Sequence, residues 1–184
     1  MTMEKIVSGL GLIAVVSGAA RMLMTPCALI WGSDSMPELW AGLVACYLMA
    51  IGSLGLYMYQ AARTGVLGLI GGLLLSLGNM ITGCLVWSTM LKAEPSPDVM
   101  FVPMANNAIM LGGLVLFAIV TFRAGQLPRW AAVLLLIWPI LGFVPVLSPW
   151  LTALWGLAYI GLGYPVWRNG KTDSGGKYKT ELSV

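Results

Sequence analysis

The sequence predicts an all-α fold, a polytopic transmembrane bundle of six helices with both termini in the cytoplasm. Hydrophobic residues make up 59% of the chain and charged residues only 9%, against roughly 45–50% and about 25% in soluble domains. The apolar residues form six stretches between short polar breaks, and six spans of about 20 residues each would use most of the chain. The charged residues are sorted between alternate breaks, which indicates the orientation.

Acidic residues lie in the first and third breaks, within residues 34–38 and 94–98. Most cations lie in other breaks and near the two ends of the chain. These cations are Lys5, Arg63, Arg123, Arg129, Arg168, Lys171, Lys177 and Lys179. Cytoplasmic loops of membrane proteins are enriched in Lys and Arg, so the cation-rich side is predicted to be cytoplasmic. Lys92 is the exception among the breaks, and Arg21 is the cation inside an apolar stretch.

The first three spans are predicted over residues 5–24, 37–62 and 66–91. Span one should end at Thr25 and Pro26, because proline lacks an amide donor and clashes with the preceding turn. Span two has Pro37 at its first turn, a favoured position. The charged start and apolar run of the first span also fit a secretory signal peptide. Its cleavage would leave five spans with the same loop orientation.

The last three spans are predicted over residues 104–122, 128–146 and 149–167. Ser148 and Pro149 form a helix start, with serine as the cap and proline at the next position. The sequence thus divides into a transmembrane domain, 1–168, and a cytoplasmic tail, 169–184. The tail is polar and glycine-rich, so we expect it to be disordered.

The composition argues against several functions. Histidine is absent, which removes the commonest acid–base catalyst and a frequent metal ligand. Cys27, Cys46 and Cys84 are scattered and form no C-x-x-C motif. No nucleophile–base pair or phosphate-binding loop is visible, so we expect no enzyme, no metal site and no cofactor. The net charge of +3 comes from the predicted loops and tail, and no basic stripe with aromatic residues points to nucleic acid.

Arg21 is the first candidate for a functional residue, because an ionised side chain within a span is costly and often functional. Counted from Lys5, it lies roughly 24 Å into a core of about 30 Å. The first interpretation is that its long side chain reaches the outer surface and pairs with Asp34 or Glu38. The alternative is that Arg21 contacts the anionic group of a ligand at the mouth of a cavity.

Polar and aromatic residues within other spans complete the candidate site. Asn79 and Asn106 are amides at membrane depth, where each needs a partner. They either join helices or form the polar floor of a cavity, whereas Gln60 is expected to face the headgroups. Trp138 and Trp155 lie too deep for the interfacial aromatic belts. The candidate ligand-binding residues are Arg21, Asn79, Asn106 and Trp155.

Small residues recur along span three at Gly68, Gly72 and Ser76. Faces of this kind let helices approach closely. We expect this face either to pack within the bundle or to bind a membrane-protein partner, including a second copy of the chain. The other expected partner is the lipid bilayer.

Three predicted helix ends share a local pattern. An aromatic residue and an arginine are followed by a glycine two residues after the arginine, at Gly65, Gly125 and Gly170. Glycine tolerates the left-handed conformation that ends helices, and arginine suits the negative helix terminus. Either the chain consists of three tandem helical hairpins, or it has no repeat and its cytoplasmic helix ends share this pattern because the same chemistry suits each of them.

Residues 123–168 carry an R-x-G-x-L-P-R-W turn and a G-x-G-aromatic-x-x-W helix end. The positions concerned are Arg123, Gly125, Leu127, Pro128, Arg129, Trp130, Gly161, Gly163, Tyr164 and Trp167. This part resembles the C-terminal half of small uncharacterised bacterial six-helix integral membrane proteins. The resemblance implies a six-helix fold and a multi-pass location in a bacterial inner membrane. It implies no activity.

Two functional hypotheses follow. The first is an integral membrane protein without catalytic machinery, either an accessory or assembly component or a binder of a small apolar or amphipathic molecule. The second is a small-solute transport protein or the substrate-binding membrane subunit of a transporter. A cavity lined by the four candidate residues would favour binding or transport, and an exposed small-residue face on span three would favour assembly.

Overall fold

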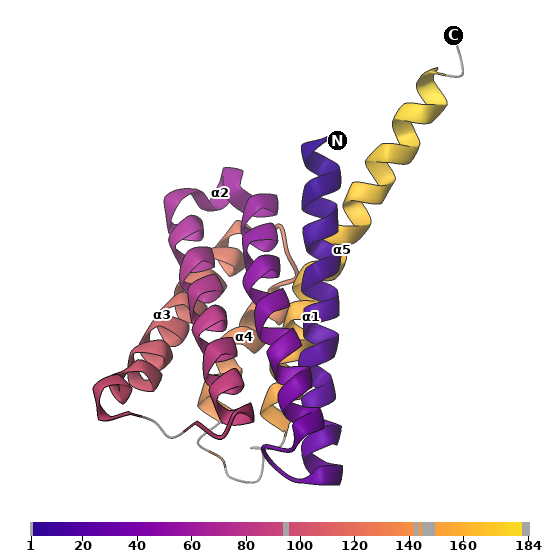
Figure 1. Cartoon of the computed structure of the whole chain (residues 1–184). Helices are drawn as coiled ribbons and strands as arrows, with labels where there is room; N and C mark the ends of the chain where they lie inside the picture. The colour runs from indigo at the N-terminus through magenta and orange to yellow at the C-terminus, as the bar shows by residue number, and fades with distance from the viewer. Residues whose placement is uncertain (1, 94–95, 142–143, 145–149, 182–184) are drawn as a thin grey trace.

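The computed structural model describes residues 2–93, 96–141, 144 and 150–181, with side chains as far as residue 169. The described chain is all-α. Its helices are α1 (Met3–Trp31), α2 (Met36–Met90), α3 (Phe101–Ala124), α4 (Arg129–Leu141) and α5 (Leu151–Glu181), with a 3-10 helix η1 (Pro97–Val99) between α2 and α3 (Figure 1). Within the described residues, three segments are long and apolar enough to cross a membrane, Met3–Trp31, Met36–Met90 and Pro97–Ala124, and α4 is a shorter apolar helix. The predictions of an all-α fold and of several candidate membrane spans are confirmed.

Helix α2 is a hairpin of two helical arms. A straight helix of its 55 residues would be roughly 80 Å long, far more than a bilayer core. Gly65 breaks it with φ 54° and ψ −144°, a conformation that glycine adopts most readily. Beyond this break the chain returns, because Gly72 packs against Tyr57 and Gly83 against the ring of Tyr47. We call residues 36–64 the first arm and residues 66–90 the second arm.

The ends of several helices meet at one end of the molecule. Gly125 ends α3 in the left-handed conformation. Arg63 Nη1, near the end of the first arm, donates a hydrogen bond to the carbonyl oxygen of Ala124 (3.3 Å). Asn169 Nδ2 on α5 donates to the hydroxyl of Tyr59 (2.7 Å). These two hydrogen bonds join the pattern that ends at Gly65 to the patterns that end at Gly125 and Gly170.

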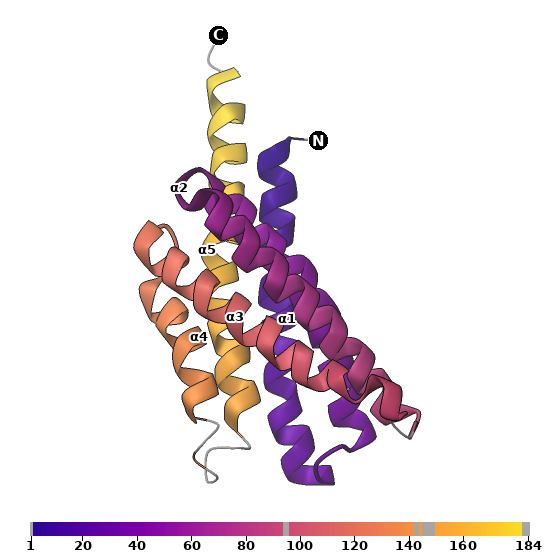
Figure 2. The same ribbon diagram turned by 90° about the vertical axis from the view of Figure 1, so that its left-hand side faces the viewer.

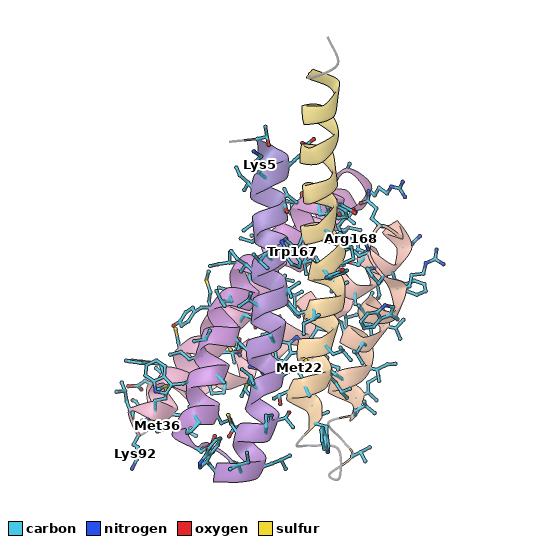
Figure 3. The ribbon with its side chains drawn as sticks, turned by 90° about the vertical axis from the view of Figure 1, so that its right-hand side faces the viewer. Lys5, Met22, Met36, Lys92, Trp167 and Arg168 are labelled. Carbon is cyan, nitrogen blue, oxygen red and sulfur yellow. The ribbon has the colours of Figure 1, made fainter. Side chains whose placement is uncertain are left out.

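The labelled residues in Figure 3 mark the two ends of the bundle. Lys5, Trp167 and Arg168 lie toward one end, and Met36 and Lys92 lie at the opposite end. The beginning of α1 and the later part of α5 therefore share an end, as Figure 1 also shows for the two termini. Lys5 and Arg168, two cations predicted to be cytoplasmic, therefore lie at the end opposite to Lys92, the lysine that departs from the charge pattern.

Glycines set the closest helix contacts, as is common where membrane helices pack. Helices α1 and α5 lie side by side (Figure 2), and a methyl group at Gly18 would collide with the backbone carbonyl of Gly156. Gly52 of the first arm packs against Ala14 of α1 in the same way. Large apolar side chains also point outward; for example, Val66 is 71% exposed and Met104 is 76% exposed. Such a surface suits lipid contact.

Helix α1 does not end at Pro26, as the sequence predicted, but continues to Trp31. A proline removes one backbone hydrogen bond, which a helix tolerates when neighbouring helices supply other contacts. Here the hydroxyl of Thr25 is hydrogen-bonded to that of Thr152 on α5 (2.8 Å). The helix ends at Gly32, whose φ of 89° stops it.

The last helices also differ from their predicted limits. Helix α5 continues to Glu181, so residues 169–181 are helical where the sequence predicted a disordered tail. No proline follows Pro165 in this stretch, and glycine costs a helix only about 1 kcal/mol per residue. The described part of α4 ends at Leu141. The predicted end of span five near residue 146 and the predicted helix start at Ser148 lie outside the described residues.

Candidate functional site

Arg21 points into the protein. Its side chain is only 8% exposed, Nη1 donates to Cys46 Sγ on the first arm (3.5 Å), and Cζ lies 4.2 Å from the ring centroid of Trp155 on α5. The prediction that Arg21 reaches the outer surface and pairs with Asp34 or Glu38 is wrong. Glu38 Oε2 accepts a hydrogen bond from the backbone amide of Asp34 instead (2.8 Å).

The helical register of α1 explains this orientation. Buried positions follow one another at three- and four-residue intervals, the period of a helix face. They include Ala14, Gly18, Arg21 and Thr25. Gly18 packs directly on Gly156 of α5. Arg21 is the next residue on this face of α1, and it meets α5 at Trp155, the residue before Gly156.

Two tryptophans extend the contact of Arg21 with α5. The rings of Trp138 on α4 and Trp155 on α5 are stacked, with centroids 4.6 Å apart and an interplanar angle of 11°. Trp155 therefore contacts both the cation, in a favourable cation–π geometry, and the ring of Trp138. The tryptophans that the sequence placed too deep for the interfacial belts form one stack.

Polar groups of both α2 arms and α5 lie beside this stack. Ser53 Oγ donates to the carbonyl of Met49 (2.7 Å) and lies 2.8 Å from the Tyr159 hydroxyl, so the tyrosine is the donor in that pair. Asn79 Nδ2 donates to the carbonyl of Leu75 in its own helix (2.8 Å), and the Asn79 side chain neighbours Tyr159.

We call this set the Arg21 cluster. It consists of Arg21, Cys46, Ser53, Asn79, Trp138, Trp155 and Tyr159. Sequence reasoning missed Cys46, Ser53, Trp138 and Tyr159 as site residues, although it noted the depth of Trp138. Tyr159 lies one helical turn after Trp155 and so on the same face, a signal that could have found it. Nothing local in the sequence singled out Cys46.

The remaining predicted site residue has a different partner. Asn106 Nδ2 on α3 donates to Thr82 Oγ1 on the second arm (2.9 Å), and Thr82 donates to the carbonyl of Gly78 (2.8 Å). This is an interhelical hydrogen bond of the kind expected for a membrane amide. The structure thus brings Arg21, Trp155 and Asn79 into one cluster and places Asn106 in the α2–α3 contact.

Gln60 does not face the headgroups, as the sequence predicted. Its side chain is fully buried, and Nε2 donates to Thr121 Oγ1 on α3 (2.7 Å). Gln60 follows Ser53 and Leu56 on the buried face of the first arm, which turns it toward the neighbouring helix. The position of Gln60 near the end of the span suggested contact with the headgroups. The face of the helix on which it lies turns it toward Thr121 of α3 instead.

The small-residue face of the second arm is covered within the chain. Gly68, Gly72 and Ser76 are all buried. Gly68 packs against Thr64 and Tyr57 of the first arm, and Gly72 also packs against Tyr57. Of the two expected roles of this face, the structure shows packing within the bundle, because the hairpin of α2 covers the face.

Several polar atoms of the Arg21 cluster are buried without a hydrogen-bond partner. They are Arg21 Nε, Asn79 Oδ1, Trp138 Nε1 and Trp155 Nε1. A buried unsatisfied polar group costs about 1–3 kcal/mol, and more if it is charged. Within the part of the chain that the structure describes, no carboxylate forms an ion pair with Arg21. The cluster therefore combines an uncompensated cation with two free indole donors and one free amide acceptor.

The described residues contain no group of three or more histidine, cysteine, aspartate or glutamate side chains that could hold a metal ion. Comparisons with protein-family models, curated proteins and solved structures give no match to this chain. The resemblance of residues 123–168 to small bacterial six-helix membrane proteins therefore stays a prediction. The function has to be argued from the geometry of the cluster.

Proposed function

We propose that this chain is a non-enzymatic, multi-pass protein of a bacterial inner membrane that binds a small amphipathic molecule at the Arg21 cluster. The proposed topology has six spans: α1, the two arms of α2, α3, α4 with the apolar residues that follow it in the sequence, and α5. Both termini are then on the cytoplasmic side. The common end shared by Lys5 and Arg168 in Figure 3 supports this orientation.

The observation that carries the proposal is the environment of Arg21. Arg21 is only 8% exposed, so its guanidinium has lost most of its water, and the described residues give it a neutral sulfur and an aromatic ring in place of a counter-ion. Charged residues inside membrane proteins usually pair with one another or line functional sites. A ligand with an anionic head would neutralise this cation.

Transport of a small solute is the second candidate function. It is supported by buried amide oxygens without partners on α2 and α3. Asn79 lies within the cluster, and Gln60 and Asn106 lie outside it. Such acceptors suit a polar solute or bound water. An assembly role through the small-residue face is less well supported, because the first arm of α2 covers that face.

The binding function is tested by native mass spectrometry of the full chain in mild detergent. The wild type should carry a co-purifying molecule of constant mass, and Arg21→Gln should lose it. The matched control is Arg123→Gln, which removes an exposed cation. The proposal fails if the Arg21 variant folds and retains the same co-purifying molecule.

The topology makes a separate prediction. Single cysteines at Ser96 and Ser174, introduced into a chain without its native cysteines, should react with a membrane-impermeant maleimide from opposite sides of the membrane. The expected face for Ser174 is cytoplasmic, because it lies among the cations of the tail. Labelling of both positions from one side would contradict the six-span arrangement.

A further inference from the structure

We infer that the head of the bound molecule is a carboxylate, held in the plane of the Arg21 guanidinium at the edge that carries Nε. The inference rests on the proposed function and specifies its ligand class. It follows from the groups that already occupy the other approaches to the guanidinium, from the charge of the cluster, and from the shape that remains.

The first argument concerns the contacts that the guanidinium already makes within the protein. Nη1 is committed to Cys46 Sγ (3.5 Å). The ring of Trp155 lies against the guanidinium, with its centroid 4.2 Å from Cζ. Nε is buried and has no partner. The Nε edge, where two parallel N–H groups form a fork that matches a carboxylate, is thus the approach that needs an acceptor.

The second argument is charge. The cluster contains one cation, and its acceptor Cys46 is a thiol, which is a weak hydrogen-bond acceptor when neutral. A monoanion brings the net charge of the site to zero. A dianionic phosphate monoester would leave an excess negative charge buried, and a neutral alcohol would leave the cation uncompensated; both are costly away from water.

The third argument is shape. A carboxylate is planar and can lie in the guanidinium plane with both oxygens on the fork. A phosphodiester is also a monoanion, but it is tetrahedral and carries two ester arms that extend above and below this plane. The ring of Trp155, with its centroid 4.2 Å from Cζ, and Trp138 stacked on it limit the room beside the guanidinium, which favours the flat head group.

The carboxylate could belong to a membrane fatty acid or to a small organic acid from water. Both share the chemistry that Arg21 would recognise. Oleate and acetate distinguish these sources, oleyl alcohol tests the charge with the same chain, and dioleoylphosphatidylglycerol tests the shape with a monoanionic phosphodiester.

The experiment measures the binding of these four probes to the delipidated full chain in dodecyl maltoside at pH 8, by native mass spectrometry titration. Oleate should bind about tenfold or more tightly than oleyl alcohol, since charge-assisted bonds are roughly twice as strong as neutral ones. Arg21→Gln should abolish this preference. Arg21→Lys should keep part of it, because lysine retains the charge and lacks the planar fork. Arg123→Gln should behave as the wild type.

The outcomes separate the inference from the function on which it rests. Displacement of oleate by millimolar acetate supports the carboxylate and assigns it to an aqueous acid. Equal binding of oleate and oleyl alcohol, or tighter binding of dioleoylphosphatidylglycerol, overturns the carboxylate while the binding function stands. Failure of every probe to bind the folded wild type overturns the carboxylate assignment. The binding function is then decided by the separate test, which asks whether a molecule co-purifies with the wild type and is lost in Arg21→Gln.

Discussion

Two polar regions inside this bundle differ in charge and in the partners to which their nitrogens donate hydrogen bonds. Between α2 and α3, the neutral amides of Gln60 and Asn106 each donate to a threonine hydroxyl on the facing helix. In the Arg21 cluster, a cation has a thiol and an aromatic ring as neighbours and an unpartnered Nε. The first region is built to hold helices together, and the second has an unmet need for an anion.

The same kind of substitution should therefore have opposite effects in the two regions. Removing a neutral amide that joins two helices takes away a contact that stabilises the fold. Removing a buried cation that has no counter-ion removes an unfavourable desolvation free energy and should stabilise the fold. The following predictions use this contrast, and each is measured as the change in unfolding free energy of delipidated protein in detergent, because a bound ligand would add its own stabilisation.

The largest effect is expected at the helix crossing that places Arg21. Gly18→Val should destabilise the protein by about 3 kcal/mol, the upper part of the usual range for overpacking, because the new side chain meets the backbone of Gly156. Gly9→Val is the control in the same helix, since no atom lies within 4 Å of a Cβ built there. Equal stability of the two variants would mean that α1 and α5 do not cross at Gly18.

Arg21→Met should stabilise the delipidated protein, by about 1–4 kcal/mol, as found when buried ionic groups are replaced by apolar side chains of similar size. The physical reason is that methionine needs no desolvation and can still pack against Trp155. Arg63→Met is the control, because Arg63 is exposed and bonds only to the carbonyl of Ala124 among the contacts shown. A marked loss of stability in Arg21→Met would show that Arg21 serves the fold and would weaken the case for a ligand.

Gln60→Leu should destabilise the protein by about 0.6–2 kcal/mol, the range measured for hydrogen bonds between membrane helices. The loss arises because Thr121, which is fully buried, no longer receives a hydrogen bond from the facing helix. A double-mutant cycle with Thr121→Val isolates the pair. Additive effects in that cycle would mean that the two side chains do not interact.

The smallest effect is expected for Asn79→Leu, below about 0.6 kcal/mol, the average for interhelical bonds. Its donated hydrogen bond goes to Leu75 in its own helix, so the contact with another helix that is lost is the one with Tyr159. If Asn79 helps to form the ligand site, the variant should instead weaken binding of the co-purifying molecule. A loss of stability as large as that of Gln60→Leu would show that Asn79 joins helices.

Sequence reasoning succeeded where the signal is local. The apolar composition predicted helices long enough to cross a membrane. The break between spans two and three, predicted near residues 62–66, is a hairpin at Gly65, and the predicted end of span four coincides with a left-handed glycine at Gly125. Such breaks depend on the backbone freedom of one residue, which the sequence displays directly.

The amino-acid sequence by itself determined the helical character of this protein, the presence of helices long and apolar enough to cross a membrane, and the positions of its main turns. Tertiary structure alone decided that Arg21 meets Trp155 and Cys46, that Gln60 meets Thr121, and that α1 continues through Pro26. The reason is geometric. Depth along a span can be counted from the sequence, but the direction of a side chain depends on which helix face is covered, and that follows from where glycines let neighbouring helices cross.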